Sequence, residues 1–227
     1  MVKDRIAVFV NDMTIGGLSR AAANLLKGFV DLGHTVDLLV VNEQGPLLKE
    51  IPEKTRIIEI RKKSTNIKDK IEMRINLRRY ILDESPDRLY SITGHYVPLQ
   101  VFALTPTDTS LYLIQETIRD GRKLGLKRYF KYRLLEDPLY QLATEVIATS
   151  EDIANEIADF SLVPREAIHV VGNPIDIQQI QTSINKKADH RFYESSTPLI
   201  LGAGHLRELK DYATLIKAME VVLQDND

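Results

Sequence analysis

Short apolar segments alternate with longer amphipathic ones along most of this chain. Arg5–Val10 and Thr35–Val41 are compact apolar runs, whereas Leu18–Leu32 carries its apolar residues at helical spacing. Gly33 follows that stretch, as a helix-ending glycine commonly does. The alternation is typical of βαβ units, and it predicts an α/β fold in which helices flank a Rossmann-like parallel sheet.

The same pattern continues to residue 177. The further strands we expect are Arg56–Ile60, Arg88–Ile92, Ser110–Ile114, Glu145–Thr149 and Ile168–Val171. The further helices we expect are Asn66–Leu82, Val97–Leu104, Leu124–Leu142, which Pro138 should kink or end, and Glu151–Phe160, which Ser150 should cap.

The last fifty residues follow a different pattern. Residues 178–197 are polar and poor in aliphatic side chains, which is typical of a linker. One strand, Pro198–Ala203, and one helix, Asp211–Leu223, come after it. A single strand and helix cannot bury both faces of a parallel strand. We therefore expect a domain over 1–177, a linker over 178–197, and the truncated start of a second Rossmann-like domain over 198–227.

Composition excludes several classes of function. The chain has 227 residues, 44% of them hydrophobic, and a net charge of −2, so bulk charge gives no reason to expect nucleic-acid binding. It has no cysteine, which excludes disulfides, thiolate catalysis and cysteine-ligated zinc and fits a reducing compartment. No segment approaches the ~20 apolar residues of a membrane span, so we expect a cytoplasmic protein.

A glycine pair, Gly16 and Gly17, separates the first strand from the first helix. Glycines permit close approach of a ligand to the backbone, and the free N–H groups of a helix N-terminus attract anions. Arg20 lies one turn further on and is placed to reach such an anion. A tight strand-to-helix turn is the alternative interpretation, because the third glycine of the dinucleotide-binding fingerprint is absent.

A second glycine-rich loop follows the expected last strand. Gly204 and His205 stand near its start and Lys210 at its end. Glycines at a strand end followed by cationic groups are a typical phosphate-binding arrangement. This loop is therefore a candidate diphosphate site.

His95 follows the fourth expected strand and Glu116 the fifth. Open α/β sheets bind ligands at the carboxyl ends of their strands. His95 is thus a candidate to hydrogen-bond a sugar hydroxyl or a phosphate, and Glu116 a candidate for a hydroxylated acceptor. The alternatives are an incidental surface histidine and a solvated loop carboxylate.

The segment Arg119–Arg133 carries seven cationic residues interleaved with leucine and aromatic residues, and a second basic cluster spans Arg61–Arg79. Helices of this kind bind anionic membrane surfaces, each cation near the surface contributing about 1 kcal/mol. A solvated helix face is the commoner explanation of such a charge run. Nucleic acid is the least favoured partner.

Four stretches together resemble family 4 of the glycosyltransferases, which have the GT-B fold of two facing Rossmann-like domains. They are Gly16-Gly17 with Arg20, the LGHTV turn Leu32–Val36, the pair Ile147–Glu151 and Val171–Asp176, and Gly204–Lys210 with the helix start after it. Each motif is unspecific alone, and their order and spacing carry the likeness.

The resemblance implies that the first domain binds a glycan or lipid-linked acceptor and the second a nucleotide sugar. Substrate binding is then assigned to Gly16, Gly17, Arg20 and Asn173, tentative catalytic roles to His95 and Glu116, and the donor diphosphate to Gly204, His205 and Lys210. Retaining enzymes of this kind need no metal or other cofactor, since cationic side chains and helix N-termini stabilise the leaving diphosphate.

Two departures from the family pattern bear on activity. His205 stands where the family has an arginine, which removes a permanent cation. The family's donor-binding glutamate pair has no counterpart up to residue 227. We therefore expect no sugar transfer by this chain alone. The alternatives are a non-catalytic partner subunit that completes a split GT-B pair with a second chain, and a Rossmann-like enzyme such as a GT-B epimerase.

Overall fold

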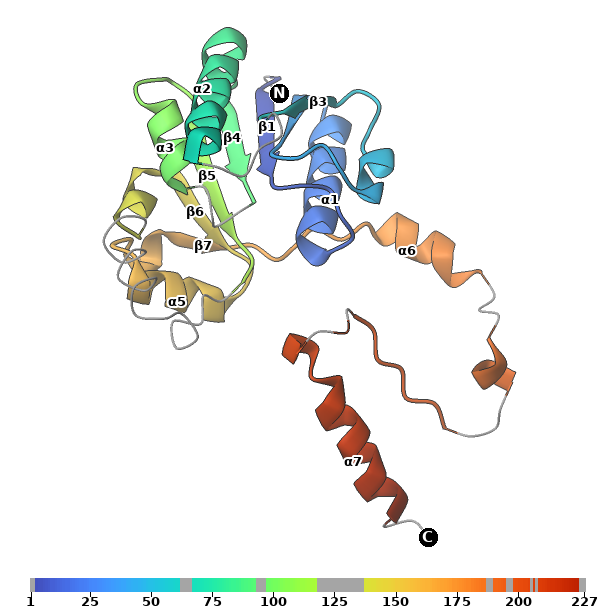
Figure 1. Cartoon of the computed structure of the whole chain (residues 1–227). Helices are drawn as coiled ribbons and strands as arrows, with labels where there is room; N and C mark the ends of the chain where they lie inside the picture. The colour runs from blue at the N-terminus through green and yellow to red at the C-terminus, as the bar shows by residue number, and fades with distance from the viewer. Residues whose placement is uncertain are drawn as a thin grey trace. The chain divides into compact units, whose positions relative to one another are not determined.

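The computed structural model describes residues 3–61, 67–92, 97–117, 137–186, 190–194, 198–204, 206 and 208–224. Within the chain, two compact units are distinguished, Met1–Asp176 and Ile177–Asp227 (Figure 1).

The first unit is built on a seven-stranded sheet in the order β3-β2-β1-β4-β5-β6-β7, and every adjacent pair is parallel. The strands are β1 (Arg5–Val10), β2 (Thr35–Val40), β3 (Arg56–Glu59), β4 (Arg88–Ser91), β5 (Ser110–Gln115), β6 (Glu145–Ala148) and β7 (Ile168–Val170). All seven strands expected for this unit are confirmed to within two residues. The α/β, Rossmann-like prediction is therefore correct.

The helices of this unit also match their expected positions where the structure describes them. They are α1 (Gly17–Asp31), α2 (Ile67–Glu84), α3 (Val97–Leu104) and α5 (Glu151–Phe160), with short 3-10 turns η1 (Pro46–Glu50), η3 (Asp137–Leu142) and η4 (Arg165–Ala167). Ser150 caps α5 as predicted, because its side chain accepts a hydrogen bond from the Ile153 N–H.

Both faces of the inner strand β1 are buried, which explains its continuous apolar run. Ile6, Val8 and Val10 pack with α1 on one face. Ala7 and Phe9 face the opposite cluster, to which α2, α3 and α5 contribute (Figure 1). Helices therefore cover the sheet on both sides, and α1 lies over β1 and β2.

The strand order reverses between β1 and β4, because the chain leaves β1 toward β2 and returns to pair β4 on its other side. At such a switch point the connections leave to opposite faces, and a crevice opens at the carboxyl ends of the strands. The loop Asn11–Gly16 and the residues after β4, β5 and β6 belong to this edge.

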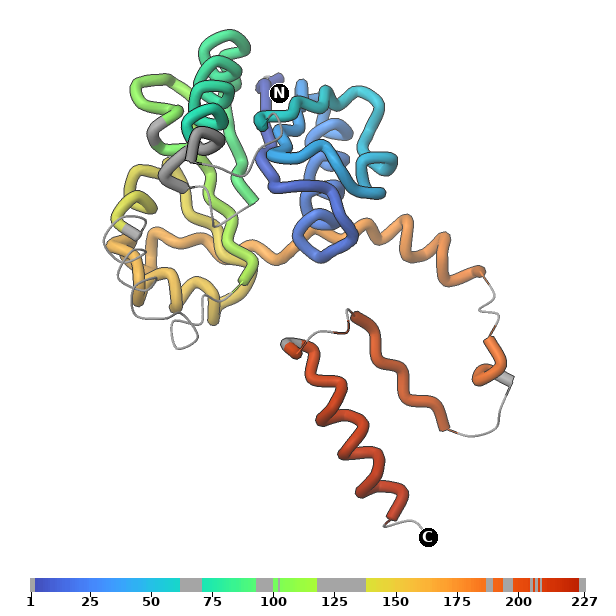
Figure 2. Tube along the Cα trace, viewed as in Figure 1, coloured from blue at the N-terminus to red at the C-terminus, as the bar shows by residue number. Residues whose placement is uncertain are grey.

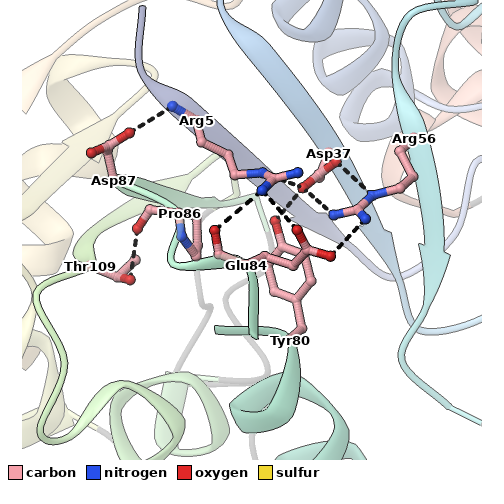
Figure 3. Close-up of polar contacts among 8 residues, drawn as sticks. All are labelled: Arg5, Asp37, Arg56, Tyr80, Glu84, Pro86, Asp87 and Thr109. Atoms are coloured by element: carbon pink, nitrogen blue, oxygen red, sulfur yellow. Dashed lines mark hydrogen bonds and ion pairs between the residues drawn. The ribbon is translucent and has the colours of Figure 1, made fainter. Parts of the chain in front are cut away.

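A polar network occupies the opposite, amino edge of the sheet (Figure 3). Asp37 of β2 is only 1% exposed. Arg56 contacts both of its carboxylate oxygens at 3.0 and 2.9 Å, and the Tyr80 hydroxyl donates to Oδ2 at 2.7 Å. Arg5 lies 3.3 Å from the same oxygen, and Glu84 bridges both arginines at 2.7 Å. The buried charge is thus paired and hydrogen-bonded.

The second unit, Ile177–Asp227, contains helices and short turns in its described part. It contains the helices α6 (Ile177–Ile184) and α7 (Tyr212–Gln224) and the 3-10 turns η5 (Arg191–Glu194) and η6 (Glu208–Lys210). The helix α6 overlaps residues 178–184 of the expected linker. Its Ile177, Ile180 and Ile184 recur at helical spacing and form an apolar face. The helix expected over Asp211–Leu223 is present as α7.

The prediction of a strand over Pro198–Ala203 is wrong. Residues 198–203 have no regular secondary structure, and the trace in Figure 2 follows them as an extended segment. Leu199, Ile200 and Leu201 are 45%, 61% and 74% exposed. A parallel strand requires a hydrogen-bonded neighbour, and the described part of this unit contains no strand that would pair with it.

The helix predicted over Leu124–Leu142 falls mostly outside the described residues. Its described end, Asp137–Leu142, is the 3-10 turn η3. Pro138 stands near the start of this turn, where the missing proline N–H breaks no helical hydrogen bond.

Candidate functional site

The glycine pair lies where β1 ends and α1 begins, at the carboxyl edge of the sheet. Gly16 has an extended backbone (φ 177°, ψ 163°), a conformation open to other residues. No described atom lies within 4 Å of the position that a Cβ would occupy on Gly16 or Gly17. The described part of the fold therefore leaves space beside both glycines, as a ligand approaching the backbone would require.

Hydrogen bonds within this loop and from the loop after β2 hold it in place. The Asp12 carboxylate accepts hydrogen bonds from the Thr14 N–H at 3.1 Å and from the Thr14 hydroxyl at 2.6 Å. The loop after β2 braces it from outside: the Met13 N–H donates to Gln44 O at 2.9 Å, and the Leu47 N–H donates to Met13 O at 3.1 Å. The glycine loop is thus preorganised by hydrogen bonds across two loops.

Arg20 forms an ion pair with an acidic residue. Its guanidinium hydrogen-bonds both carboxylate oxygens of Glu50 in η1. The hydrogen bond to Glu50 is the main reason that the pKa of Arg20 is raised. A role for Arg20 in holding an anion stays a prediction, and an anionic ligand would have to compete with Glu50.

A pocket of about 250 Å³ opens on the α1 side of the sheet, near the carboxyl ends of β4 to β7. It is lined by Ala21, Leu25, Phe29, Tyr90, Ile92, Ile114, Glu116, Ile147, Thr149, Val171, Gly172, Asn173 and Pro174. Most of these side chains are apolar. The pocket thus brings together Glu116 and Asn173, two residues proposed from the sequence for the substrate site.

Glu116 is the only acidic residue among the described residues that line this pocket. It follows β5 directly and is half-buried. Its Oε1 atom is buried and has no hydrogen-bond partner among the described residues. Burial without a compensating partner disfavours the carboxylate and raises the pKa of Glu116. This carboxyl group is therefore placed to accept a hydrogen bond from a ligand.

One wall of the pocket is tied to α1. The Asn24 side chain donates to Pro174 O at 2.9 Å, and Lys27 pairs with Asp176 at 2.5 Å. Together these contacts fasten the segment after β7 to the helix. Asn173 is exposed within this fastened segment, so its position is fixed by its neighbours.

The candidate diphosphate residues belong to the second unit. Gly204 has φ +150°, and a Cβ built on it would lie 3.6 Å from Lys210 Cε and 3.1 Å from the Tyr212 hydroxyl. Asp211 caps α7 by accepting a hydrogen bond from the Thr214 N–H at 3.3 Å, and its other carboxylate oxygen accepts one from the Thr214 hydroxyl at 2.8 Å. Gly204 and Lys210 are therefore brought together, although their proposed role stays a prediction.

Three of the sequence predictions, His95, His205 and the basic segment Arg119–Arg133, lie outside the described residues. Within the part of the chain that the structure describes, no cluster of three or more histidine, aspartate or glutamate side chains is arranged to hold a metal ion. None of the described helices combines the length and the hydropathy that a membrane crossing requires.

Sequence reasoning missed the apolar lining of the pocket and the close approach of Gly45 to the Met13 backbone. The signal for the lining was available, because Ala21, Leu25 and Phe29 recur every four residues and share one face of α1. Ile114 and Ile147 are register partners in β5 and β6, so they share one face of the sheet. Gly45 lacked such a local signal, since its role depends on a contact with Met13, 32 residues away in the chain.

Replacing Gly17 by alanine tests whether this glycine serves the fold or a ligand. We expect Gly17→Ala to leave the free energy of unfolding unchanged or to raise it by up to about 1 kcal/mol, because alanine is the better helix former and its Cβ meets open space. Urea unfolding would measure the change. A loss of more than about 1 kcal/mol would show that the glycine is needed for folding.

Comparisons with known proteins give one family and one fold. The family model described as Glycosyltransferase Family 4 matches residues 15–179, which is more than half of the chain. Comparison with curated protein sequences gives no match.

Solved structures share the fold at low sequence identity. A glycosyltransferase from Rickettsia africae ESF-5 is 15% identical, with a TM-score of 0.56, over 86% of this chain and 51% of that one. Alr3699/HepE from Anabaena, solved in complex with UDP and glucose, is 13% identical with a TM-score of 0.58, over 80% and 50%. A UDP-GlcNAc 2-epimerase from Methanocaldococcus jannaschii is 12% identical with a TM-score of 0.54, over 74% and 45%.

These neighbours include glycosyltransferases of the GT-B fold, and the chain spans about half of their length. At this identity the likeness establishes the fold alone, and an epimerase shares it as well.

Proposed function

We propose that this chain, which belongs to Glycosyltransferase Family 4, supplies the acceptor-binding part of an enzyme that transfers a sugar from a nucleotide sugar to a glycan or a lipid-linked acceptor. The observation that carries the proposal is the family match over residues 15–179. That range includes the glycine pair and every described residue that lines the pocket beside Glu116. The residues matched by the family model thus include the candidate site.

In the proposed reaction, the bond between the anomeric carbon and the donor phosphate oxygen breaks, and a bond from that carbon to an acceptor hydroxyl oxygen forms. The products are the glycosylated acceptor, the nucleoside diphosphate and the hydroxyl proton. We assign acceptor binding to Glu116 and Asn173, and close backbone approach to Gly16 and Gly17. Gly204, His205 and Lys210 are assigned to the diphosphate, whose leaving charge cationic groups and helix N–H groups stabilise.

Support for a nucleotide sugar as donor comes from a structural neighbour. Alr3699/HepE has been solved with UDP-glucose, and it is 14% identical to this chain. Retention of the anomeric configuration is proposed from the family resemblance. We propose an anionic membrane surface as a further partner of Arg119–Arg133, on the basis of the charges in that segment.

We expect the purified 227-residue chain to show no sugar transfer by itself. The described part of the unit Ile177–Asp227 contains no strand, so it lacks the sheet edge at which a Rossmann-like donor pocket is built. The measurement is release of the nucleoside diphosphate from a panel of nucleotide sugars, with candidate acceptors present. Steady turnover by the chain alone would contradict this expectation.

The alternative is a non-catalytic partner subunit that completes a split GT-B pair with a second chain. Adding a separately expressed GT-B donor domain distinguishes the two. Restored transfer, with the product's anomeric configuration read by NMR, supports an acceptor-side catalytic half. Co-elution in size-exclusion chromatography without any transfer supports the partner subunit.

A further inference from the structure

We propose that the pocket beside Glu116 binds an acceptor that joins a hydroxyl group to an apolar body about the size of one six-membered ring. The inference rests on the proposed function and deepens it, because it states which part of the acceptor this chain recognises. It is carried by three observations: the size of the pocket, the chemistry of its lining, and the buried carboxyl oxygen of Glu116.

Size limits the part of the ligand that enters. The pocket has a volume of about 250 Å³. An engineered apolar cavity of about 150 Å³ in another protein holds one benzene molecule. The pocket therefore has room for one substituted ring, whereas an extended oligosaccharide would have to continue beyond it.

The lining favours an apolar body. Ile114 and Ile147 are register partners on neighbouring strands and form the floor, while Leu25 and Phe29 of α1 form a wall. Phe29 also packs against Tyr90, with their ring centroids 5.0 Å apart. A bare sugar ring presents hydroxyl groups on most of its edge, and these would lose hydrogen bonds to water against such walls. An apolar ring or aglycone gains free energy in the same place.

Two polar residues of the lining stand at the ends of neighbouring strands. Glu116 directly follows β5, and Thr149 directly follows β6. The last residues of the two strands, Gln115 and Ala148, are register partners, so Glu116 and Thr149 are neighbours at the carboxyl edge of the sheet. The Oε1 atom of Glu116 is buried and has no hydrogen-bond partner among the described residues. A buried acceptor atom without a donor is unfavourable, and a ligand hydroxyl that reaches it removes this penalty. The pocket thus combines an apolar lining with a carboxyl group that is able to accept a hydrogen bond.

The pocket is also held open by contacts outside it. Asn24 and Lys27 fasten the segment after β7 to α1 through Pro174 and Asp176. The ligand therefore meets a preformed wall, which lowers the entropy that binding must overcome.

The test compares two probes on the 227-residue chain. Phenyl β-D-glucopyranoside and methyl β-D-glucopyranoside share their hydroxyl groups and differ in the apolar body. We expect the phenyl glycoside to bind about tenfold more tightly in an NMR titration, which corresponds to burial of one aromatic ring. Equal affinities for the two probes would overturn the proposal.

Three variants locate the binding. Leu25→Trp fills the pocket from α1, where Leu25 is half-buried, and we expect it to abolish the preference for the phenyl probe. Glu116→Gln should weaken both probes about fivefold and keep their ratio, because a neutral hydrogen bond replaces a charge-assisted one. Glu166→Gln, the same change at an exposed carboxyl group outside the pocket, should leave both affinities unchanged.

Should Leu25→Trp fail to fold, Ala21→Leu fills the same pocket with a smaller change. A phenyl preference that survives in the folded filling variant would overturn the proposal, as would unchanged affinity in Glu116→Gln. The titration requires neither donor nor turnover. Sugar transfer by the completed enzyme without a phenyl preference would therefore reject this subsite alone, and a phenyl preference without transfer would reject the proposed function alone.

Discussion

Asp37→Ala is expected to lower the free energy of unfolding of the first unit by about 3–5 kcal/mol, the range observed when one partner of a buried ion pair is removed. The carboxylate is 1% exposed and accepts hydrogen bonds from Arg56 at 3.0 and 2.9 Å. It also accepts the Tyr80 hydroxyl, at 2.7 Å. Alanine removes the acceptor of all three bonds and leaves two arginines near a small cavity. Urea unfolding followed by circular dichroism measures the change.

Two further variants separate charge from packing. Asp37→Asn keeps the volume and one acceptor oxygen, so we expect a smaller loss than for alanine. The double variant Asp37→Leu/Tyr80→Phe replaces the central contact with apolar atoms, and we expect it to be more stable than Asp37→Ala. A loss of less than about 1 kcal/mol in Asp37→Ala would contradict the assigned role of the network.

The same network makes a prediction about pH. The hydrogen bond from Arg56 is the main reason that the pKa of Glu84 is lowered from its ordinary value of 4.5. A carboxyl group with a lowered folded-state pKa stabilises the fold above its unfolded-state pKa, and this contribution is lost as the pH falls through the folded-state value. The stability difference between wild type and Glu84→Gln should therefore shrink as the pH is lowered from roughly 6 to 3.

The sheet was predictable because its signals are local. Strands such as Arg5–Val10 are apolar on both faces, and helices such as Glu151–Phe160 carry a capping serine and an amphipathic pattern within ten residues. Pro198–Ala203 has an equally apolar sequence but forms no strand, because strand formation depends on a neighbour that local pattern cannot supply.

Part of the candidate site was also predictable, because some of its signals are local in the sequence. The rule that ligands bind at the carboxyl ends of parallel strands selected Glu116, and the pocket contains it. The partner of Arg20 was not predictable, since Glu50 is 30 residues away and reaches it through a 3-10 turn. The buried ion pair of Asp37 could have been predicted. A charged residue within an otherwise buried strand requires a partner from elsewhere in the fold.

Gly45→Ala is expected to destabilise the first unit by about 3 kcal/mol and to displace the glycine loop. Gly45 has φ +116°, a conformation that costs about 1–3 kcal/mol for a residue with a side chain. A Cβ there would also lie 2.2 Å from the Met13 carbonyl carbon and 2.4 Å from the Thr14 nitrogen. Backbone atoms cannot rotate away as a flexible side chain can, so the loop itself has to move.

Gly28→Ala is the matched control, because Gly28 is exposed on α1 and no described atom lies within 4 Å of its Cβ position. We expect this variant to be more stable than wild type by about 0.5–1 kcal/mol.

Hydrogen exchange at residues 11–17 should become faster in Gly45→Ala and stay unchanged in Gly28→Ala. Since the brace from Gln44 and Leu47 positions the same loop, affinity for any ligand that approaches Gly16 and Gly17 should fall along with stability. Unchanged exchange in a destabilised Gly45→Ala would instead place the strain in the loop after β2, and the glycine loop would then be independent of its brace.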